Sequence, residues 1–157
     1  MEYVPTEIKY IRLPHYVENG ANLSYATPLS ACFDICAALP EALTLLPGER
    51  YAVPTGLKMA PEAPLWLRVN SRSGMAVKGG IITVAGIIDS DYRGEIKIVL
   101  LNTNRSGEGY VINPGDKIAQ MELPFPYRAV FREVDSREFE TLLATERGGS
   151  GFGSSGK

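Results

Sequence analysis

The chain has 157 residues, 45% of them hydrophobic, which is enough for one domain that folds without disulfide bonds or a structural metal. Its formal net charge of −2 supplies no long-range field for holding duplex nucleic acid, and no apolar run is long enough to span a membrane, so we expect neither partner. Two cysteines and one histidine are too few for a Cys/His zinc site within one chain. The first ten residues lack the apolar core of a signal peptide, so we expect a cytoplasmic protein, or one of the host cytosol or nucleus if the source is a virus.

The first chemically distinctive segment is SACFDICAA, residues 30–38, in which Asp34 is the lone carboxylate among small and apolar residues. A buried carboxylate must be hydrogen-bonded or lie near a cation, so Asp34 is a candidate site residue. An aspartate that caps a turn is the more ordinary interpretation of this segment alone. Cys32 and Cys36 would share one face of a strand, which favours reduced, buried thiols over a redox pair.

Residues 64–70, PLWLRVN, alternate with a period of two and predict a strand. The strand leads into NSRSGMAVKGG, where Arg72, Ser73 and Gly74 offer a guanidinium, a hydroxyl and an unobstructed backbone amide in succession. This combination suits the oxygens of a phosphate, and a helical turn at MAVK would add its N-terminal amides. The tripeptide is common by chance, so on its own it is weak evidence for a phosphate-binding site.

The most informative segment is IITVAGIIDSDYRGEIKIVLLN, residues 81–102, which predicts two apolar strands joined by an acidic turn. Asp89 directly follows two isoleucines, so we expect it to project from a largely apolar wall. Desolvation there would make the carboxylate a better base. The alternative is that Asp89 and Asp91 are ordinary turn residues.

In NPGDKIAQMEL, residues 113–123, the first residues predict a tight turn and the rest a strand. Strict alternation places Ile118 and Gln120 on the face opposite Ala119. An inward-facing glutamine would be costly unless it hydrogen-bonded a water or a ligand. The alternative is a glutamine on an edge strand in solvent.

Near the C-terminus, SREFETLLATER, residues 136–147, has apolar residues at helical spacing and predicts a helix of one to three turns. Eight of the nine residues from 148 to 156 are Gly or Ser, a composition that loses too much chain entropy on ordering to fold without a partner. This segment is either a flexible tail or a lid that orders on a ligand, with Phe152 supplying a stacking contact and Arg147 binding an anion.

Many short strands with frequent turn residues favour an all-β sandwich or jelly roll with little helix. We therefore expect one β domain over residues 1–146, followed by a flexible glycine-rich C-terminal arm over residues 147–157.

In this order, the segments SACFDICAA, SRSG, AGIIDSDYRGEI, GDKIAQ and RGGSGFGSSG resemble the five motifs of the trimeric dUTPases, over residues 30–156. The resemblance implies a jelly-roll homotrimer whose active sites lie at the subunit interfaces. It implies hydrolysis of dUTP to dUMP and pyrophosphate with Mg²⁺, by in-line attack of water on the α-phosphate. This reaction keeps uracil out of DNA and supplies dUMP for dTMP synthesis.

The resemblance also implies roles for individual residues. Asp89 would orient and activate the attacking water, Tyr92 would pack against the deoxyribose, and Gln120 would lie near the α-phosphate. Arg72, Ser73 and Gly74 match the phosphate-binding motif, and Asp34 matches an aspartate near the water shell of the metal. The other implied nucleotide contacts lie in a uracil-reading hairpin, on the returning strand and in the arm: Thr83, Gly86, Ile87, Ile88, Lys97, Arg147, Phe152, Gly153, Ser154 and Ser155.

Three positions depart from the pattern of this family. Cys32 stands where the family usually has glycine, Thr83 stands where many members have asparagine, and Gly149-Ser150-Gly151 reorders the usual Ser-Gly-Gly of the arm. Two other functions stay open. A dCTP deaminase would share the jelly roll but lack the arm, and a non-catalytic trimer would use the fold to bind a nucleotide and engage another protein.

Overall fold

The computed structural model describes residues 4–19, 21–124, 127–142, 145 and 148–149. Within this part of the chain, strands dominate and the two helices are short, which confirms the expected all-β class. The strands are β1 Val4–Arg12, β2 Phe33–Cys36, β3 Leu43–Leu45, β4 Arg50–Pro54, β5 Leu57–Pro61, β6 Leu67–Asn70, β7 Ile81–Thr83, β8 Ile87–Ile88, β9 Lys97–Asn102, β10 Tyr110–Ile112, β11 Lys117–Glu122 and β12 Tyr127–Glu133. The helices are α1 Ser73–Gly79 and α2 Ser136–Thr141.

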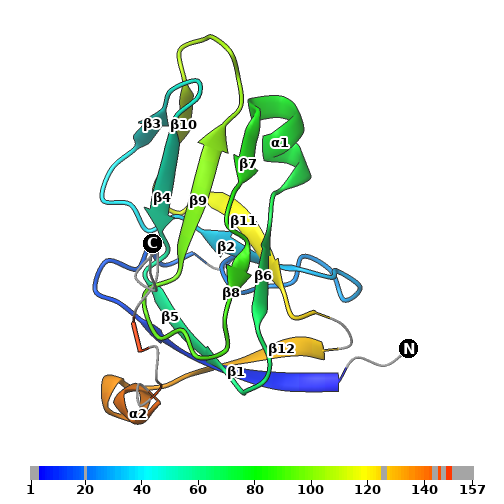
Figure 1. The fold of residues 1–157 in the computed structure, drawn as a ribbon, viewed down its shortest axis with the longest axis vertical. Helices are drawn as coiled ribbons and strands as arrows, with labels where there is room; N and C mark the ends of the chain where they lie inside the picture. The colour runs from blue at the N-terminus through cyan, green and yellow to red at the C-terminus, as the bar shows by residue number, and fades with distance from the viewer. Residues whose placement is uncertain (1–3, 20, 125–126, 143–144, 146–147, 150–157) are drawn as a thin grey trace, which may run out of the picture.

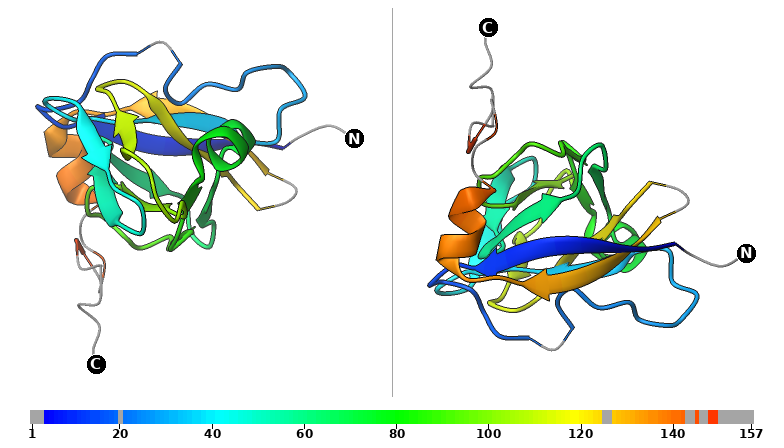
Figure 2. Two further views of the ribbon diagram at one scale, coloured as in Figure 1. Left: turned by 90° about the horizontal axis from the view of Figure 1, so that it is seen from above. Right: turned by 90° about the horizontal axis from the view of Figure 1, so that it is seen from below.

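The described strands form four small sheets with the orders β12-β1-β5, β10-β3, β2-β11-β6-β8 and β4-β9-β7. Strands far apart in the chain lie side by side: β1 pairs in parallel with β12, and β2 pairs with β11 (Figure 1). The sheets enclose the interior of the molecule (Figure 2). Nearly every strand contributes side chains to the main apolar core in this interior. Sheets that curve around a common core in this way form the expected jelly roll.

The period-two pattern correctly predicted β6 and β9. In β6, Leu67 and Val69 are buried while Arg68 is exposed, and in β9 Ile98 and Leu100 are buried in the same alternation. Apolar side chains at every second position face the core because successive side chains of a strand point to opposite sides of the sheet.

Strict alternation was wrong for β11. Ile118 and Ala119 are consecutive and both buried, because the pairing of β11 with β2 shifts register between Lys117 and Ala119. A bulge of this kind inserts one residue into a strand and so turns two neighbouring side chains toward the same side. The turn before β11 formed as expected, with Gly115 at a φ of 81°.

The two helices lie at opposite ends of the molecule (Figure 1). The expected C-terminal helix begins at Ser136 after Asp135, whose side chain accepts a hydrogen bond from the Glu138 amide at 2.8 Å. It ends at Thr141, within the expected one to three turns, and buries Phe139 in a small second cluster with Ile11. None of the helices in the described ranges is long and apolar enough to cross a membrane.

Candidate active site

A single sheet, β2-β11-β6-β8, carries four of the five sequence motifs. The first motif lies on β2, the fourth on β11, the second directly follows β6, and the third follows β8. Across the sheet, Asp34 pairs with Gln120, and Gln120 pairs with Asn70 on its other side. Motifs that are spread over about a hundred residues of the sequence therefore meet through strand pairing.

Asp34 is buried and lies between two cations. Lys117 Nζ is 2.6 Å from one carboxylate oxygen, and Arg72 Nε is 3.4 Å from the other. Arg72 also donates a hydrogen bond from Nη1 to the Lys117 carbonyl at 3.1 Å. The two cations compensate the buried charge, and Asp34 in return orients the Arg72 guanidinium at the end of β6. The Asp34 side chain thus forms ion pairs with two cations, and the turn-capping interpretation was wrong.

Helix α1 begins immediately after Arg72. Ser73 and Gly74 form its first residues and are exposed, so their polar groups face outward at the end of β6. A Cβ added at Gly74 would meet no neighbouring atom within 4 Å among the described residues. The expected unobstructed segment, with a helical turn following it, is therefore present.

Ser71 joins two of the expected site residues, Thr83 and Gln120, and was not identified from the sequence. Its hydroxyl accepts a hydrogen bond from the Thr83 amide at 2.8 Å and lies 3.0 Å from the Thr83 hydroxyl. Its carbonyl accepts a hydrogen bond from Gln120 Nε2 at 3.0 Å. The half-buried Gln120 is therefore hydrogen-bonded within the fold. Thr83, which stands where many members of the resembled family have asparagine, has the Ser71 hydroxyl as its partner. Only strand pairing brings these groups together, so no local pattern could have indicated Ser71.

The expected hairpin pairs β7 with β9, but its first strand does not continue to Ile88: the pairing of β7 with β9 ends at Thr83, and β8 runs along β6 instead. Val69 donates its amide to the Gly86 carbonyl at 2.7 Å, and a Cβ at Gly86 would lie 2.8 Å from the Val69 carbonyl oxygen. Ala85 has a φ of 65°, which tightens the chain just before this contact. Ile87 pairs with Arg68 and is 64% exposed, which leaves an apolar residue outside the core.

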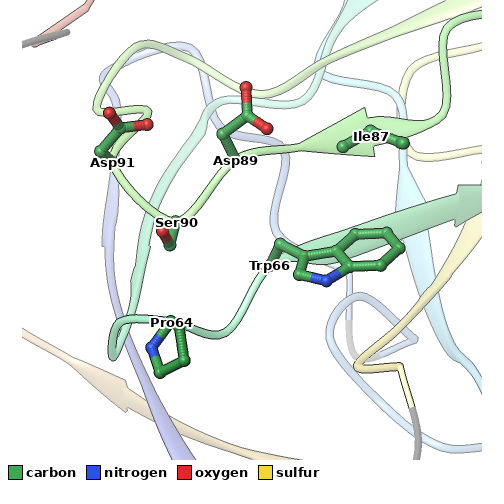
Figure 3. Close-up of a pocket in the computed structure, with 6 residues that line it drawn as sticks. All are labelled: Pro64, Trp66, Ile87, Asp89, Ser90 and Asp91. Atoms are coloured by element: carbon green, nitrogen blue, oxygen red, sulfur yellow. The ribbon is translucent and has the colours of Figure 1, made fainter.

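Asp89 lies at the mouth of an open hollow of about 550 Å³ (Figure 3). The two carboxylates of the hollow come from the loop after β8, while Trp66 and Pro64 come from the segment that leads into β6. The neighbouring wall is partly apolar, as expected, but Asp89 itself is exposed. The expected desolvation of Asp89 is therefore not provided by this chain alone, because the hairpin mouth opens to solvent.

The turn after Asp89 is compact. The Tyr92 amide donates to the Asp89 carbonyl at 3.1 Å, and the Tyr92 hydroxyl donates to the Glu95 carbonyl at 3.0 Å. Tyr92 is buried over Gly94, where any Cβ would collide with the ring. Lys97 follows as the exposed first residue of β9.

The chain does not bring Asp89 together with Arg72 and Gln120. Because Ile88 pairs with Leu67, Asp89 lies level with Trp66 near the start of β6. Arg72 follows the other end of β6, a separation of about 20 Å at roughly 3.3 Å per strand residue. Arg147, Phe152, Gly153, Ser154 and Ser155, the remaining expected contacts, lie outside the described residues.

Among the described residues, no group of three or more His, Cys, Asp or Glu side chains could hold a metal ion. Asp34, the expected indirect contact, has both carboxylate oxygens next to cationic side chains. This donor set does not fit a metal centre built from protein ligands. A magnesium ion that arrived here would take its ligands from phosphate oxygens and water, as Mg²⁺ commonly does.

The comparisons with known proteins agree on one family. The dUTPase family model matches residues 18–156. The deoxyuridine 5′-triphosphate nucleotidohydrolase of Fusobacterium nucleatum is 41% identical over 154 residues, which cover 96% of this chain and 97% of the relative. The enzyme of the same name from Leifsonia xyli is 48% identical over 134 residues, 84% of this chain and 83% of the relative.

Solved structures show the same fold. A mutant dUTPase from phage phi11 of S. aureus, with a structural Mg(II) ion, has a TM-score of 0.64 at 21% identity and covers 82% of this chain and 97% of its own. The native EIAV dUTPase has a TM-score of 0.58 at 24% identity, and the match covers 82% of this chain and 97% of that dUTPase.

Proposed function

The chain belongs to the dUTPase family, and from this premise we propose that it is a dUTP diphosphatase that hydrolyses dUTP to dUMP and pyrophosphate. The observation that carries the proposal is the common sheet β2-β11-β6-β8, which bears four of the five family motifs. A fold alone would not suffice, because one fold hosts many activities. Here the charged and polar groups needed for phosphate chemistry also lie on that sheet.

The phosphate-binding end is formed by Arg72, Ser73 and Gly74. A triphosphate carries about three to four negative charges, so the site must supply positive charge and hydrogen-bond donors. Asp34 and the Lys117 carbonyl orient the Arg72 guanidinium before the nucleotide arrives. A guanidinium held in place loses little conformational entropy when it binds phosphate oxygens.

Asp89 is the proposed general base. Its exposed carboxylate lies at the hairpin mouth, where it would orient a water molecule and take its proton during in-line attack on the α-phosphate. A general base supplies about 10²–10⁴-fold in rate, so the larger part of the acceleration comes from positioning and charge stabilisation. Gln120, held by the Ser71 carbonyl, is the proposed polar contact for the water and the α-phosphate.

Base and sugar recognition are assigned to the hairpin of β7 and β9, in the part of the chain that joins the two strands. Its backbone between Thr83 and Ile88 would read uracil through amides and carbonyls, and the buried ring of Tyr92 would leave no room for a ribose 2′-hydroxyl. A buried backbone donor or acceptor without a partner is costly, so cytosine, with its reversed pattern, would be rejected. Lys97 would add a contact from β9.

Two copies are needed for one complete site. The strand β6 separates Asp89 from Arg72 by about 20 Å, so one chain cannot place both groups on the same α-phosphate. We assign the missing half to a neighbouring copy in a homotrimer, with the arm residues Arg147, Phe152, Gly153, Ser154 and Ser155 closing over the nucleotide. Mg²⁺ would enter with the triphosphate and neutralise part of its charge.

The proposed function is tested by measuring pyrophosphate release from dUTP by the purified full-length chain with Mg²⁺, with dCTP, dTTP and UTP as parallel substrates. We expect release from dUTP alone, and loss of release when EDTA removes the metal. Ammonia release from dCTP would point to a deaminase instead. Tight binding of dUTP without turnover would point to a nucleotide-gated binding protein.

A further inference from the structure

Arg93 is a buried charge that the proposed reaction does not use. It is 8% exposed, and burial lowers its pKa, with the nearby Asp91 carboxylate acting in the opposite direction. In the described part of the chain, its guanidinium donates to three backbone carbonyls: Leu142 at 2.7 Å, Ser90 at 2.7 Å and Tyr92 at 3.0 Å. Burying a guanidinium is costly, and hydrogen bonds to carbonyls offset only part of that cost.

These carbonyls belong to two segments that are about fifty residues apart in the sequence. Ser90 and Tyr92 lie in the turn that follows Asp89, whereas Leu142 lies just after helix α2, on the way to the C-terminal arm. One planar guanidinium with several donors in a fixed geometry therefore ties the turn to the C-terminal segment.

Further hydrogen bonds join the same two segments. The Arg93 amide donates to the Gly148 carbonyl at 2.8 Å, and the Thr145 hydroxyl donates to the Asp91 carbonyl at 2.9 Å. The Thr145 hydroxyl in turn accepts from the Gly148 amide at 2.9 Å. We call these contacts of Asp91, Arg93, Leu142, Thr145 and Gly148 the clasp.

The clasp includes the first residues of the glycine-rich arm. Gly148 has a φ of 54°, and a Cβ at Gly149 would lie 3.8 Å from the Gly94 Cα, so the chain passes directly against the turn. The arm thus starts next to Arg93 and Gly94 of its own chain, in the turn that follows Asp89. The positions that its later residues can reach are limited by this starting point.

We infer that Arg93 and Thr145 are positioning residues that fix the base of the C-terminal arm to the turn carrying Asp89. The inference rests on the proposed function, since it concerns the arm and the base of that reaction. Through the clasp, a displacement of the arm base would also displace the Ser90 and Tyr92 carbonyls, so arm docking and the geometry of the catalytic turn are coupled. A shared hydrogen-bonded network is the condition under which two such positions act non-additively.

Thr145→Val tests this inference because it removes one hydroxyl and keeps the shape of the side chain. We expect it to lower kcat/KM for dUTP by about tenfold, since the hydroxyl makes two hydrogen bonds of the clasp. Arg93→Lys keeps the positive charge but loses the planar guanidinium with its several donors, and we expect it to lower kcat/KM further than Thr145→Val does. The matched control is Thr141→Val, whose hydroxyl donates to the Glu138 carbonyl within α2 and touches neither segment; its kcat/KM should equal that of the wild type.

A double-mutant cycle in the full-length chain separates positioning from general destabilisation. Phe152→Ala removes the stacking contact proposed for the arm. If Thr145 acts through the arm, Thr145→Val causes no further loss in the Phe152→Ala background. An equal loss in both backgrounds, or no loss in the wild-type background, would overturn the inference.

A second measurement does not depend on activity. Hydrogen exchange followed by NMR reports on the Arg93 amide, whose acceptor is the Gly148 carbonyl. We expect the amide to be protected in the wild type and to exchange faster in Thr145→Val, with the core amides of β9 unchanged. An Arg93 amide that already exchanges freely in the wild type would contradict the clasp. If the wild type releases no pyrophosphate from dUTP, the proposed function fails, whereas this exchange result still decides whether the clasp exists.

Discussion

Asp34 illustrates how one buried charge organises its neighbours. Its carboxylate lies 2.6 Å from Lys117 Nζ and 3.4 Å from Arg72 Nε, so two motifs that are distant in the sequence are held by one ion-pair network. Removing one partner of a buried ion pair leaves an uncompensated charge. The free-energy cost of that charge is larger than the stabilisation that the intact pair provides. The network therefore explains why an otherwise apolar strand, β2, carries a carboxylate.

The proposed role of Asp89 predicts a specific effect of Asp89→Asn. The amide has nearly the same shape but cannot accept a proton, so turnover of dUTP should fall by about 10²–10⁴-fold. Binding should persist, because the replacement also removes a negative charge near the triphosphate. Steady-state rates and calorimetric binding of a non-hydrolysable dUTP analogue measure the two effects. A variant that turns over within about tenfold of the wild type would refute the assigned role.

The buried thiol of Cys36 predicts a loss of stability at high pH. Cys36 is 1% exposed, and burial raises the pKa of its thiol to about 11. The unfolded chain loses this proton near the ordinary cysteine pKa of about 8.5. Between the two values the folded state binds more protons, so the free energy of unfolding falls as pH rises through this range and is unaffected below it.

Urea unfolding at about pH 8 and about pH 10.5 measures this effect. The midpoint should fall more for the wild type than for Cys36→Ala, which lacks the titrating group. An identical fall in both proteins would show that other groups account for the pH dependence.

At the level of elements, the hairpin formed by β7 and β9 depends on the close approach of its connecting segment, which contains β8, to β6. Gly86 is the residue that permits this approach, because a Cβ there would lie 2.8 Å from the Val69 carbonyl oxygen. A backbone oxygen cannot move aside as a flexible side chain can. The same strand pairing sets the position of Asp89, which follows Ile88 by one residue.

We therefore expect Gly86→Ala to displace the hairpin, with a loss of about 1–3 kcal/mol in the free energy of unfolding and a raised KM for dUTP. Gly74→Ala is the matched control for stability. A Cβ at Gly74 meets no neighbouring atom in the part of the chain that the structure describes, and alanine is the better helix former, so the melting temperature of Gly74→Ala should equal or exceed that of the wild type. Equal melting temperatures for Gly86→Ala and the wild type would contradict the steric explanation.

For the whole molecule, the proposed division into a β domain and an arm predicts the effect of truncation. The apolar core consists of residues that precede the arm, such as Ile8, Met59 and Phe139. Ending the chain after Glu146 should therefore abolish most of the dUTP turnover and change the melting temperature little. A large drop in melting temperature would show that the last eleven residues belong to the folded domain.

Assembly is the second property of the whole molecule that can be measured. The proposed site takes Asp89 and Arg72 from different copies, because the two residues follow opposite ends of the β6–β8 pairing in one chain. Analytical ultracentrifugation at the protein concentration of the activity assay should find trimers. An active enzyme that sediments only as single subunits would contradict a site shared between copies.

Several features were determined by the sequence itself. The strands β6 and β9 follow from apolar residues at every second position, and α2 follows from apolar residues at helical spacing, of which Phe139 is buried. The motifs around Asp34, Arg72, Asp89 and Gln120 were recognisable in order. These features are local, because strand and helix periods and turn chemistry act over a few neighbouring residues.

Other features were decided only by the tertiary structure. The bulge in β11 buries Ile118 beside Ala119, Ser71 meets Thr83 and Gln120, and Arg93 reaches Leu142. The exposure of Asp89 and its distance from Arg72 also depend on how β8 pairs with β6. The physical reason is common to all of them: hydrogen bonds, ion pairs and burial depend on which strands become neighbours, and this is a property of the folded chain rather than of any short segment.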